Sequence, residues 1–308
     1  MLKKLLIALV VLVLVALGGL YALSRPERLD PDQIAAEGSG DATRGERLFW
    51  AGGCVSCHAP SKVKGEDRLN LAGGDPLNTQ FGTFHAPNIS PDPDDGIGRW
   101  TLADFANALQ RGVDPEGRHL YPAFPYTSYV RMTKEDVADL WAFLKTLPPV
   151  TGNAPANDLD FPFNIREGVG LWKLVFLGDG SPVLTLPDGA SEAAHSGQYL
   201  VEGPGHCGEC HTPRSFSGAG GLDTAEWLAG APNPEGKGNV PNITPSKAGI
   251  GSWSAEDIAY YLESGFTPDF DSVGGAMVEV QENMAKLPAS DREAIAAYLK
   301  AVPARGGD

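Results

Sequence analysis

The sequence predicts an all-α protein that consists of two consecutive copies of one unit. Apolar residues recur at helical spacing near the end of the first copy, at Val137, Leu140 and Leu144, and no stretch alternates long enough to indicate a strand. Similar residues also recur at a nearly fixed offset, since Trp100 and Trp253 are 153 positions apart. Self-similarity of this kind indicates a tandem duplication.

Length and composition fit two modest domains. The 308 residues correspond to roughly two domains of about 150 residues each, and the 42% apolar content is ordinary for a globular protein. The 38 glycines and 25 prolines indicate long irregular loops between short helices. A formal charge of −15 argues against a nucleic-acid partner, and favours either solubility alone or a partner with a basic surface.

Residues 1–30 are expected to anchor the chain in a membrane. Lys3 and Lys4 precede 19 uncharged residues at positions 5–23, which is long enough for a transmembrane helix. No clear small-x-small cleavage site follows, and a cleaved signal peptide is the alternative. Both interpretations export the rest of the chain, because the two lysines stay on the cytoplasmic side.

The repeat divides the remaining chain into three regions. They are a first domain at 31–150, a linker at 151–192 and a second domain at 193–308. Each domain is predicted to contain three helices, at 45–51, 102–110 and 134–147 in the first domain and at 197–202, 255–264 and 291–301 in the second.

Glycines and helix caps repeat together with the helices. Gly45 and Gly197 stand at equivalent places in the first helix of each domain, where the missing Cβ lets another helix cross closely. The second helix follows an N-cap residue, Thr101 or Ser254, with an aspartate three positions on in both copies. This pattern resembles a capping box with Asp in place of Glu.

The linker 151–192 carries more large apolar residues than a free linker would. They are concentrated at 161–166 (FPFNIR) and 168–176 (GVGLWKLVF). We expect these segments to pack against or between the domains. Docking to a partner subunit or to the membrane surface is the alternative.

The pattern C-x-x-C-H occurs once in each domain. Its members are Cys54, Cys57 and His58 in the first domain and Cys207, Cys210 and His211 in the second. Two thiols at this spacing reach the two vinyl groups at one edge of a porphyrin, and the imidazole that follows ligates the iron. The sequence therefore predicts two covalently attached haem c groups.

These motifs use every cysteine of the chain. None is left for a structural disulfide, two such pentapeptides are hard to explain as zinc sites, and no βαβ context of a thioredoxin-like pair is visible. Pro60 and Pro213 fall two residues after the histidines. They are candidates for shaping the loop whose carbonyl accepts a hydrogen bond from the other ring nitrogen of each histidine.

Methionines are the expected ligands on the distal side of each iron, because a thioether suits electron transfer. The first domain contains only Met132 in the distal region, and a simple packing role is its alternative. The second contains Met277 and Met284, and matching the third helices places Met132 opposite Leu287, so the repeat does not choose between them. We favour Met277, because the glycines before it give a flexible approach to the ring.

Histidines are alternative distal ligands. His85 and His119 leave bis-histidine ligation of the first haem open, although both are expected in loops or near the propionates. His206 adjoins Cys207 and is too close to it to reach the opposite face of the second haem.

Several segments outside the haem motifs are distinctive. They are residues 81–92, 96–101, 120–126 and 132–136 in the first domain, 161–164 in the linker and 276–283 in the second domain. These segments resemble the cytochrome c subunits of membrane-bound bacterial alcohol and gluconate-type dehydrogenases. The resemblance covers most of residues 40–302, and it implies two class I cytochrome c domains with Met277 as a distal ligand.

The sequence departs from this family in two respects. The family generally carries three haem motifs, so a third domain is expected to be missing here. Some relatives have methionine where Phe124 stands, which leaves Met132 as the only thioether of the first domain.

The resemblance implies an electron carrier and not a dehydrogenase in its own right. The chain would be anchored in the inner (cytoplasmic) membrane with its haem domains in the periplasm. It would take electrons from a periplasmic or membrane-bound dehydrogenase and pass them to a soluble cytochrome c or a terminal oxidase. The alternative is an enzyme with a reactive haem, such as a dihaem peroxidase or a thiosulfate-oxidising cytochrome, which would need an open iron and nearby acid–base groups.

Overall fold

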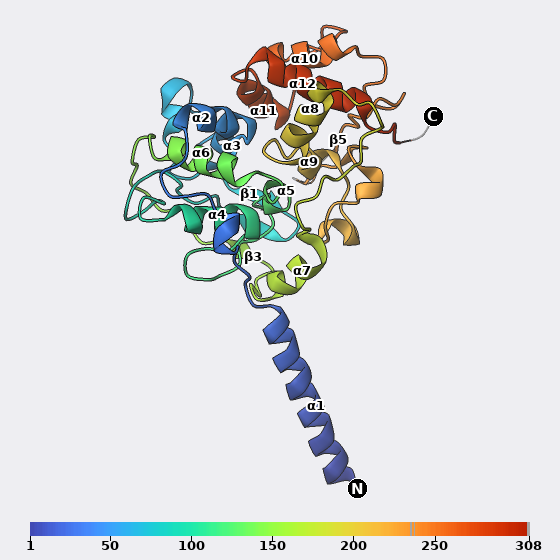
Figure 1. Ribbon diagram of the computed structural model, residues 1–308. Helices are drawn as coiled ribbons and strands as arrows, with labels where there is room; N and C mark the ends of the chain where they lie inside the picture. Colours follow the sequence, from blue (N-terminus) through green and yellow to red (C-terminus); the bar gives the residue numbers. More distant parts are fainter. Residues whose placement is uncertain (235, 237, 307–308) are drawn as a thin grey trace.

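The computed structural model describes residues 1–234, 236 and 238–306, and this part of the chain is mostly helical. Helix α1 (Leu2–Leu23) projects from one end of the globular body (Figure 1). None of its residues is buried, and it is long and apolar enough to cross a membrane. A signal sequence would pass the same test of length and composition.

The first half of the globular body follows the expected series of helices. Its elements are η1 (Pro31–Gln33), α2 (Ala42–Ala51), α3 (Cys54–His58), η2 (Gly65–Leu69), α4 (Leu102–Arg111), α5 (Tyr126–Tyr129) and α6 (Lys134–Leu144). Helix α7 (Gly168–Phe176) then forms within the linker.

The second half has its α-helices in a similar order, with two 3-10 helices after the motif helix. Its elements are α8 (Glu192–Glu202), α9 (Gly208–His211), η3 (Phe216–Gly218), η4 (Thr224–Glu226), α10 (Ala255–Ser264), α11 (Met277–Met284) and α12 (Ala289–Ala301). In Figure 1 the blue-to-green helices and the yellow-to-red helices form two neighbouring groups.

Short strands add to the expected all-helical architecture. Strands β1 (Leu77–Thr79), β2 (Gly82–Phe84) and β3 (Asp158–Leu159) form one antiparallel sheet in that order, and β4 (Ala231–Pro232) pairs with β5 (Asn239–Val240). Strands of two or three residues are too short to leave an alternating pattern in the sequence. Because β3 belongs to the linker and pairs with β2, the start of the linker is held on the first half.

Equivalent helices cross in both halves at the two predicted glycines. Helix α2 packs against α6, and α8 packs against α12. A Cβ built at Gly45 would lie 1.9 Å from the carbonyl oxygen of Asp139, and one at Gly197 would lie 1.9 Å from that of Ala294. The predicted close crossing is confirmed in both places.

The predicted caps are confirmed, whereas some predicted helix ends are wrong. Thr101 and Ser254 cap α4 and α10, each with a reciprocal contact to the aspartate three residues on. The first helices begin earlier than predicted, after the N-caps Asp41 and Ser191, so that the glycines lie inside them. Helix α6 ends at residue 144 instead of 147.

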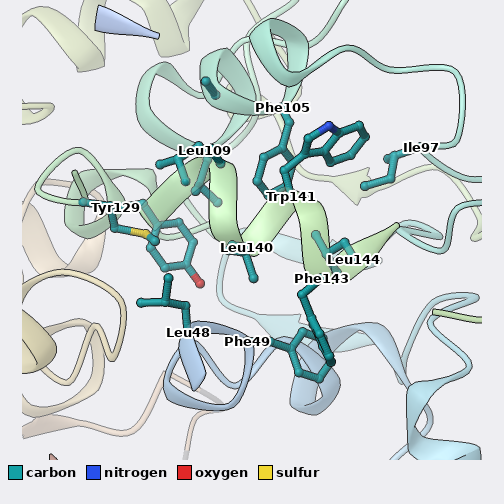
Figure 2. Close-up of a cluster of buried hydrophobic side chains, with 14 of the residues drawn as sticks. Leu48, Phe49, Ile97, Phe105, Leu109, Tyr129, Leu140, Trp141, Phe143 and Leu144 are labelled. Carbon is teal, nitrogen blue, oxygen red and sulfur yellow. The ribbon is translucent and has the colours of Figure 1, made fainter. Parts of the chain in front are cut away.

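Each half has its own hydrophobic core. In the first core, Phe105 of α4 lies beside Trp141 of α6, and Phe49 of α2 lies beside Phe143 of α6 (Figure 2). Phe105 stacks on Trp141 with ring centroids 5.1 Å apart. In the second core, helices α8, α10 and α12 bury Leu200, Tyr298 and their neighbours. Both cores adjoin a C-x-x-C-H motif, because Cys54 packs on the first and Cys207 on the second.

Candidate haem-binding sites

The first C-x-x-C-H motif forms a single helical turn. Gly53 adopts a left-handed conformation (φ 57°) that turns the chain out of α2 and into α3. Cys54 and Cys57 lie three residues apart, and so project from the same side of that turn. His58 donates a hydrogen bond from Nδ1 to the carbonyl oxygen of Pro87, at 2.7 Å. Since a carbonyl only accepts, the neutral imidazole keeps its lone pair on Nε2, where a metal binds.

The second motif has the same geometry. His211 donates from Nδ1 to the carbonyl oxygen of Pro241, at 2.8 Å. The indole ring of Trp227 lies directly over Gly208, where a Cβ would sit 2.2 Å from the ring. Burial lowers the pKa of both His58 and His211, which favours the neutral form that ligates iron.

The prediction that Pro60 and Pro213 shape the accepting loops is wrong. The acceptors are Pro87 and Pro241, some 30 residues after each histidine. Each immediately precedes a repeated asparagine that ties its loop: Asn88 donates to the carbonyl of Val150, and Asn242 to that of Arg305. The recurrence of Asn-Ile-Ser/Thr-Pro in both copies was the signal that could have pointed to these loops.

The four cysteines are thiols, and none forms a disulfide. Burial raises the pKa of Cys54 and of Cys207 to about 12, so the first thiol of each motif lies in an apolar environment. Among the described residues, no group of three or more His, Cys, Asp or Glu side chains is placed to hold a metal ion. The two pairs therefore do not form the four-ligand cage of a structural zinc site.

Met132 lies in the first core, close to the first motif. Its side chain is 4% exposed and belongs to the hydrophobic cluster against which Cys54 packs. Its carbonyl oxygen accepts a hydrogen bond from Nε2 of Gln110, at 2.7 Å, which fixes the backbone between α5 and α6.

The two methionines of the second half stand at opposite ends of α11. Met277 is the first residue of that helix and is half-buried, whereas Met284 is the last and is buried. Both pack in the cluster that also contains Cys207. Residues seven apart share one face of a helix, so both sulfurs lie on the side of α11 that faces the core.

The remaining histidines differ in how their rings are used. His119 is buried, and both ring nitrogens are engaged, Nε2 with the carbonyl oxygen of Ser24 (2.6 Å) and Nδ1 with Nζ of Lys173 (3.0 Å). This arrangement leaves no lone pair for iron. His206 uses Nε2 to donate to the carbonyl oxygen of Gly52, at 3.1 Å. His85 lies half-buried just after β2.

The residues present fit a covalently attached haem. Each site combines two thiols on one helical turn, an imidazole whose Nε2 lone pair is held in place, and an adjoining apolar cluster with a thioether. In addition, Arg111 Nε, Tyr126 Oη and Trp141 Nε1 are buried in the first half without a hydrogen-bond partner among the described residues. A prosthetic group with carboxylate oxygens supplies acceptors of the kind that these donors lack.

The fold and the motifs define the chain as a c-type cytochrome. The cytochrome c family model matches residues 42–148. The chain is 56% identical over 293 residues to a "Diheme cytochrome c-type" protein of Cereibacter sphaeroides, covering 95% of this chain and 96% of that protein. It therefore belongs to the family of c-type cytochromes that includes this protein.

Further relatives are subunits of dehydrogenase complexes. The chain is 38% identical over 265 residues to the "Fructose dehydrogenase cytochrome subunit" of Gluconobacter japonicus, and 36% identical over 282 residues to the "Gluconate 2-dehydrogenase cytochrome c subunit" of Pantoea cypripedii. These alignments cover 85% and 88% of this chain, but only 53% and 62% of those proteins. The chain thus spans little more than half the length of these two relatives. The resemblance to dehydrogenase cytochrome subunits is confirmed.

Proposed function

We propose that this protein is a membrane-anchored periplasmic dihaem cytochrome, formed by tandem duplication of two class I cytochrome c domains, that relays electrons from a dehydrogenase to a downstream acceptor. The observation that carries the proposal is a reciprocal interface between the two halves of the molecule. At this interface each C-x-x-C-H motif contacts the other half.

One residue of each motif forms a hydrogen bond to the other half. Ser56, in the first motif, accepts a hydrogen bond from Nδ2 of Asn283 in α11, at 2.9 Å. Glu209, at the equivalent place in the second motif, accepts one from Oγ of Ser128 in α5, also at 2.9 Å. Ser128 and Asn283 occupy equivalent places before the last helix of their halves.

A second pair of contacts has the same symmetry. Arg47 in α2 donates from Nη2 to Asp291 in α12, at 2.9 Å. Tyr199, at the equivalent place in α8, donates its hydroxyl to Asp136 in α6. When residue i contacts j and the equivalent of j contacts the equivalent of i, the interface is isologous, as between the subunits of a twofold dimer. This pattern supports a tandem duplication whose two copies pack as such a dimer.

The interface also brings the two motifs next to each other. The carbonyl oxygen of Gly52, two residues before Cys54, accepts the hydrogen bond from His206, which directly precedes Cys207. A Cβ at Gly52 would lie 3.5 Å from the carbonyl oxygen of Pro204, so the backbones approach closely. Electron transfer slows steeply as two centres separate, and this proximity supports a relay within one chain.

The proposed iron ligands follow from these sites. His58 and His211 would each bind an iron through Nε2, and Cys54, Cys57, Cys207 and Cys210 would hold the two porphyrins covalently. Met132 and Met277 are proposed as the second protein ligand of each iron. When bound, haem c supplies a one-electron redox couple. The chain orients the imidazoles through Pro87 and Pro241 and keeps the thioether side apolar.

The proposed location and partners rest on α1 and on the relatives. Helix α1 would remain in the cytoplasmic membrane, with Lys3 and Lys4 on the inner side and the haem domains in the periplasm. Because fructose, alcohol and gluconate dehydrogenases contain related cytochrome subunits, the proposed donor is a periplasmic or membrane-bound dehydrogenase. The proposed acceptor is a soluble cytochrome c or a terminal oxidase. The net charge of −15 argues against a nucleic-acid partner.

Affinity purification of the full-length holoprotein from solubilised membranes tests the proposed relay. We expect a dehydrogenase to copurify, and its substrate to reduce both haems without added mediator. Carbon monoxide should bind neither reduced haem rapidly, because both irons carry two protein ligands. Rapid stoichiometric binding at one haem, together with turnover of peroxide or thiosulfate, would instead identify an enzyme with a reactive haem.

A further inference from the structure

The linker presents large apolar side chains to solvent on α7 and on the segment before it. Phe161 is 79% exposed, and Phe163 and Ile165 are also exposed. On α7, Leu174 is 56% and Val175 is 71% exposed. We define these five residues as the linker patch. Packing of the linker against the domains explains why one face of α7 is buried. It does not explain why the apolar side chains of the linker patch are exposed.

The opposite face of α7 is firmly packed. Val169, Gly170 and Lys173 are its buried residues. Nζ of Lys173 donates to the carbonyl oxygens of Arg111 (2.7 Å) and Gly112 (2.6 Å), at the end of α4. Helix α7 is thereby fixed on the first half of the molecule, and the exposed residues of α7 are held outward.

The same contacts hold the end of α1. The carbonyl oxygen of Ser24, the residue after α1, accepts the hydrogen bond from His119, whose other nitrogen contacts Lys173. A Cβ at Gly170 would lie 2.2 Å from that carbonyl oxygen, so α7 touches the end of α1 directly. Figure 1 shows α7 and β3 at the end of the globular body from which α1 emerges. The linker patch therefore lies where a bilayer that holds α1 has its surface.

The charge of the linker patch also differs from that of the whole chain. The protein contains 39 acidic residues against 24 basic ones. Residues 161–178 contain one acid, Glu167, and two bases, of which Lys173 is buried against the first half and Arg166 is half-buried. Arg25, Glu27 and Arg28 follow α1 directly and are exposed. Exposed apolar side chains in a segment with few acids are typical of a segment that lies in a membrane interface.

We propose that the linker patch rests in the headgroup region of the bilayer, and that α7 acts as an interfacial helix that seats the haem domains on the membrane. This inference rests on the proposed anchoring by α1. The two contacts would act together. A single helix leaves a domain free to rotate and tilt, whereas a second contact beside it limits the distance and orientation of the haem domains relative to the membrane surface.

Site-directed spin labelling of the full-length holoprotein in lipid nanodiscs tests this contact between the linker patch and the membrane. The four native cysteines are consumed as thioethers, so one introduced cysteine is the only thiol available to the label. The test positions are Leu174→Cys and Val175→Cys. Phe270→Cys, at a side chain that is 90% exposed in the loop between α10 and α11, is the matched control. Ala16→Cys reports on α1 itself.

The accessibility of each label to oxygen and to a water-soluble nickel chelate is measured with both haems reduced. We expect the labels at 174 and 175 to be at least fivefold less accessible to the chelate than the label at 270, and to approach the value at 16. Accessibility at 174 and 175 equal to that at 270, with the label at 16 inside the lipid, would overturn the interfacial helix alone. A label at 16 exposed to water would instead refute the anchoring on which it depends.

A partner protein is the remaining occupant of this surface. If labels at 174 and 175 are exposed to water in nanodiscs but become protected when a membrane dehydrogenase is added, the linker patch belongs to that partner and the proposed membrane contact is wrong. An unchanged haem spectrum in each variant shows that the protein has folded and carries its haems.

Discussion

Met132 is the side chain on which the first proposed haem site depends most. It is buried, and the thioether that it supplies cannot be replaced by a neighbouring methionine of the first domain. Met132→Leu keeps the volume of the side chain and removes the sulfur. We expect one of the two haems to become high-spin and to bind carbon monoxide. Absorption and electron paramagnetic resonance spectra identical to those of the parent protein would exclude Met132 as a ligand.

Met277 and Met284 offer a matched pair on one helix. Both lie on the core side of α11, Met277 half-buried and Met284 buried, and replacing each by leucine removes one sulfur from that side. Met277→Leu is expected to convert the second haem to a high-spin form, whereas Met284→Leu leaves both haems low-spin. The reverse result would assign the ligand to Met284 and correct the preference drawn from the sequence.

Glu202 is a buried carboxylate beside the second motif. It is 1% exposed and accepts hydrogen bonds from the Tyr298 hydroxyl (2.6 Å), from Nε2 of Gln198 (3.0 Å) and from the Val183 amide (2.6 Å). Tyr298 in turn accepts from Nε1 of Trp227, whose ring covers Gly208 in the motif. A carboxylate at this place would favour the more positively charged, oxidised iron of the haem proposed there.

Replacing Glu202 by Gln should therefore raise the potential of the second haem. The side chain keeps its shape and loses one charge. We expect an upward shift on the order of 50 mV for one haem only, as for a charge acting through a partly buried environment. Spectroelectrochemical titration measures both potentials. Glu226→Gln, at an exposed position of the same domain, is the control and should change neither potential.

At the scale of single elements, the helix crossings constrain the sequence most strictly. Gly45→Ala or Gly197→Ala would place a methyl group 1.9 Å from a backbone carbonyl oxygen of the crossing helix. Alanine normally stabilises a helix interior relative to glycine by about 0.5–1 kcal/mol. Here the overlap forces the helices apart, and we expect a net loss of about 1–3 kcal/mol or more.

Thermal unfolding measures this loss, as a fall in Tm. Gly168→Ala, at the first residue of α7, is the control because a Cβ there would meet no heavy atom within 4 Å and should be tolerated. Equal Tm values for the three variants would show that the crossings tolerate a side chain.

The helices also show what the sequence predicts well and what it does not. Caps and glycine positions are local patterns, and those at Thr101, Ser254, Gly45 and Gly197 were predicted correctly. Helix α11 was not predicted, because Met277–Met284 has no N-cap hydrogen bond from a side chain and follows a glycine-rich loop. The short strands have too few residues to show a period.

At the scale of the whole molecule, the reciprocal interface is the feature that couples the two halves. Arg47→Gln removes the guanidinium that faces the buried carboxylate of Asp291. We expect the interface to weaken by roughly 2 kcal/mol, because a charged hydrogen bond is lost and a buried carboxylate is left unpaired. Electron equilibration between the haems after flash reduction should then slow, while both haem spectra stay unchanged.

An exposed ion pair provides the control for this variant. Arg99→Gln removes a partner of Asp94 in a pair whose side chains are 72% and 73% exposed, and neither residue forms a hydrogen bond or ion pair with the described part of the second half. Such pairs contribute little to stability, so equilibration should proceed at the parent rate. If Arg47→Gln also leaves that rate unchanged, the interface does not control transfer between the two centres.

The sequence by itself determined the two C-x-x-C-H motifs, the helix caps and the apolar N-terminal helix, because each depends on the spacing of nearby residues. The tertiary structure decided which carbonyl oxygens accept hydrogen bonds from His58 and His211. It also decided that the linker forms strand β3 and helix α7, and which residues of the two halves contact each other. These features join residues from about 30 to more than 200 positions apart. Contacts at such separations depend on the path of the whole chain, which no local pattern records.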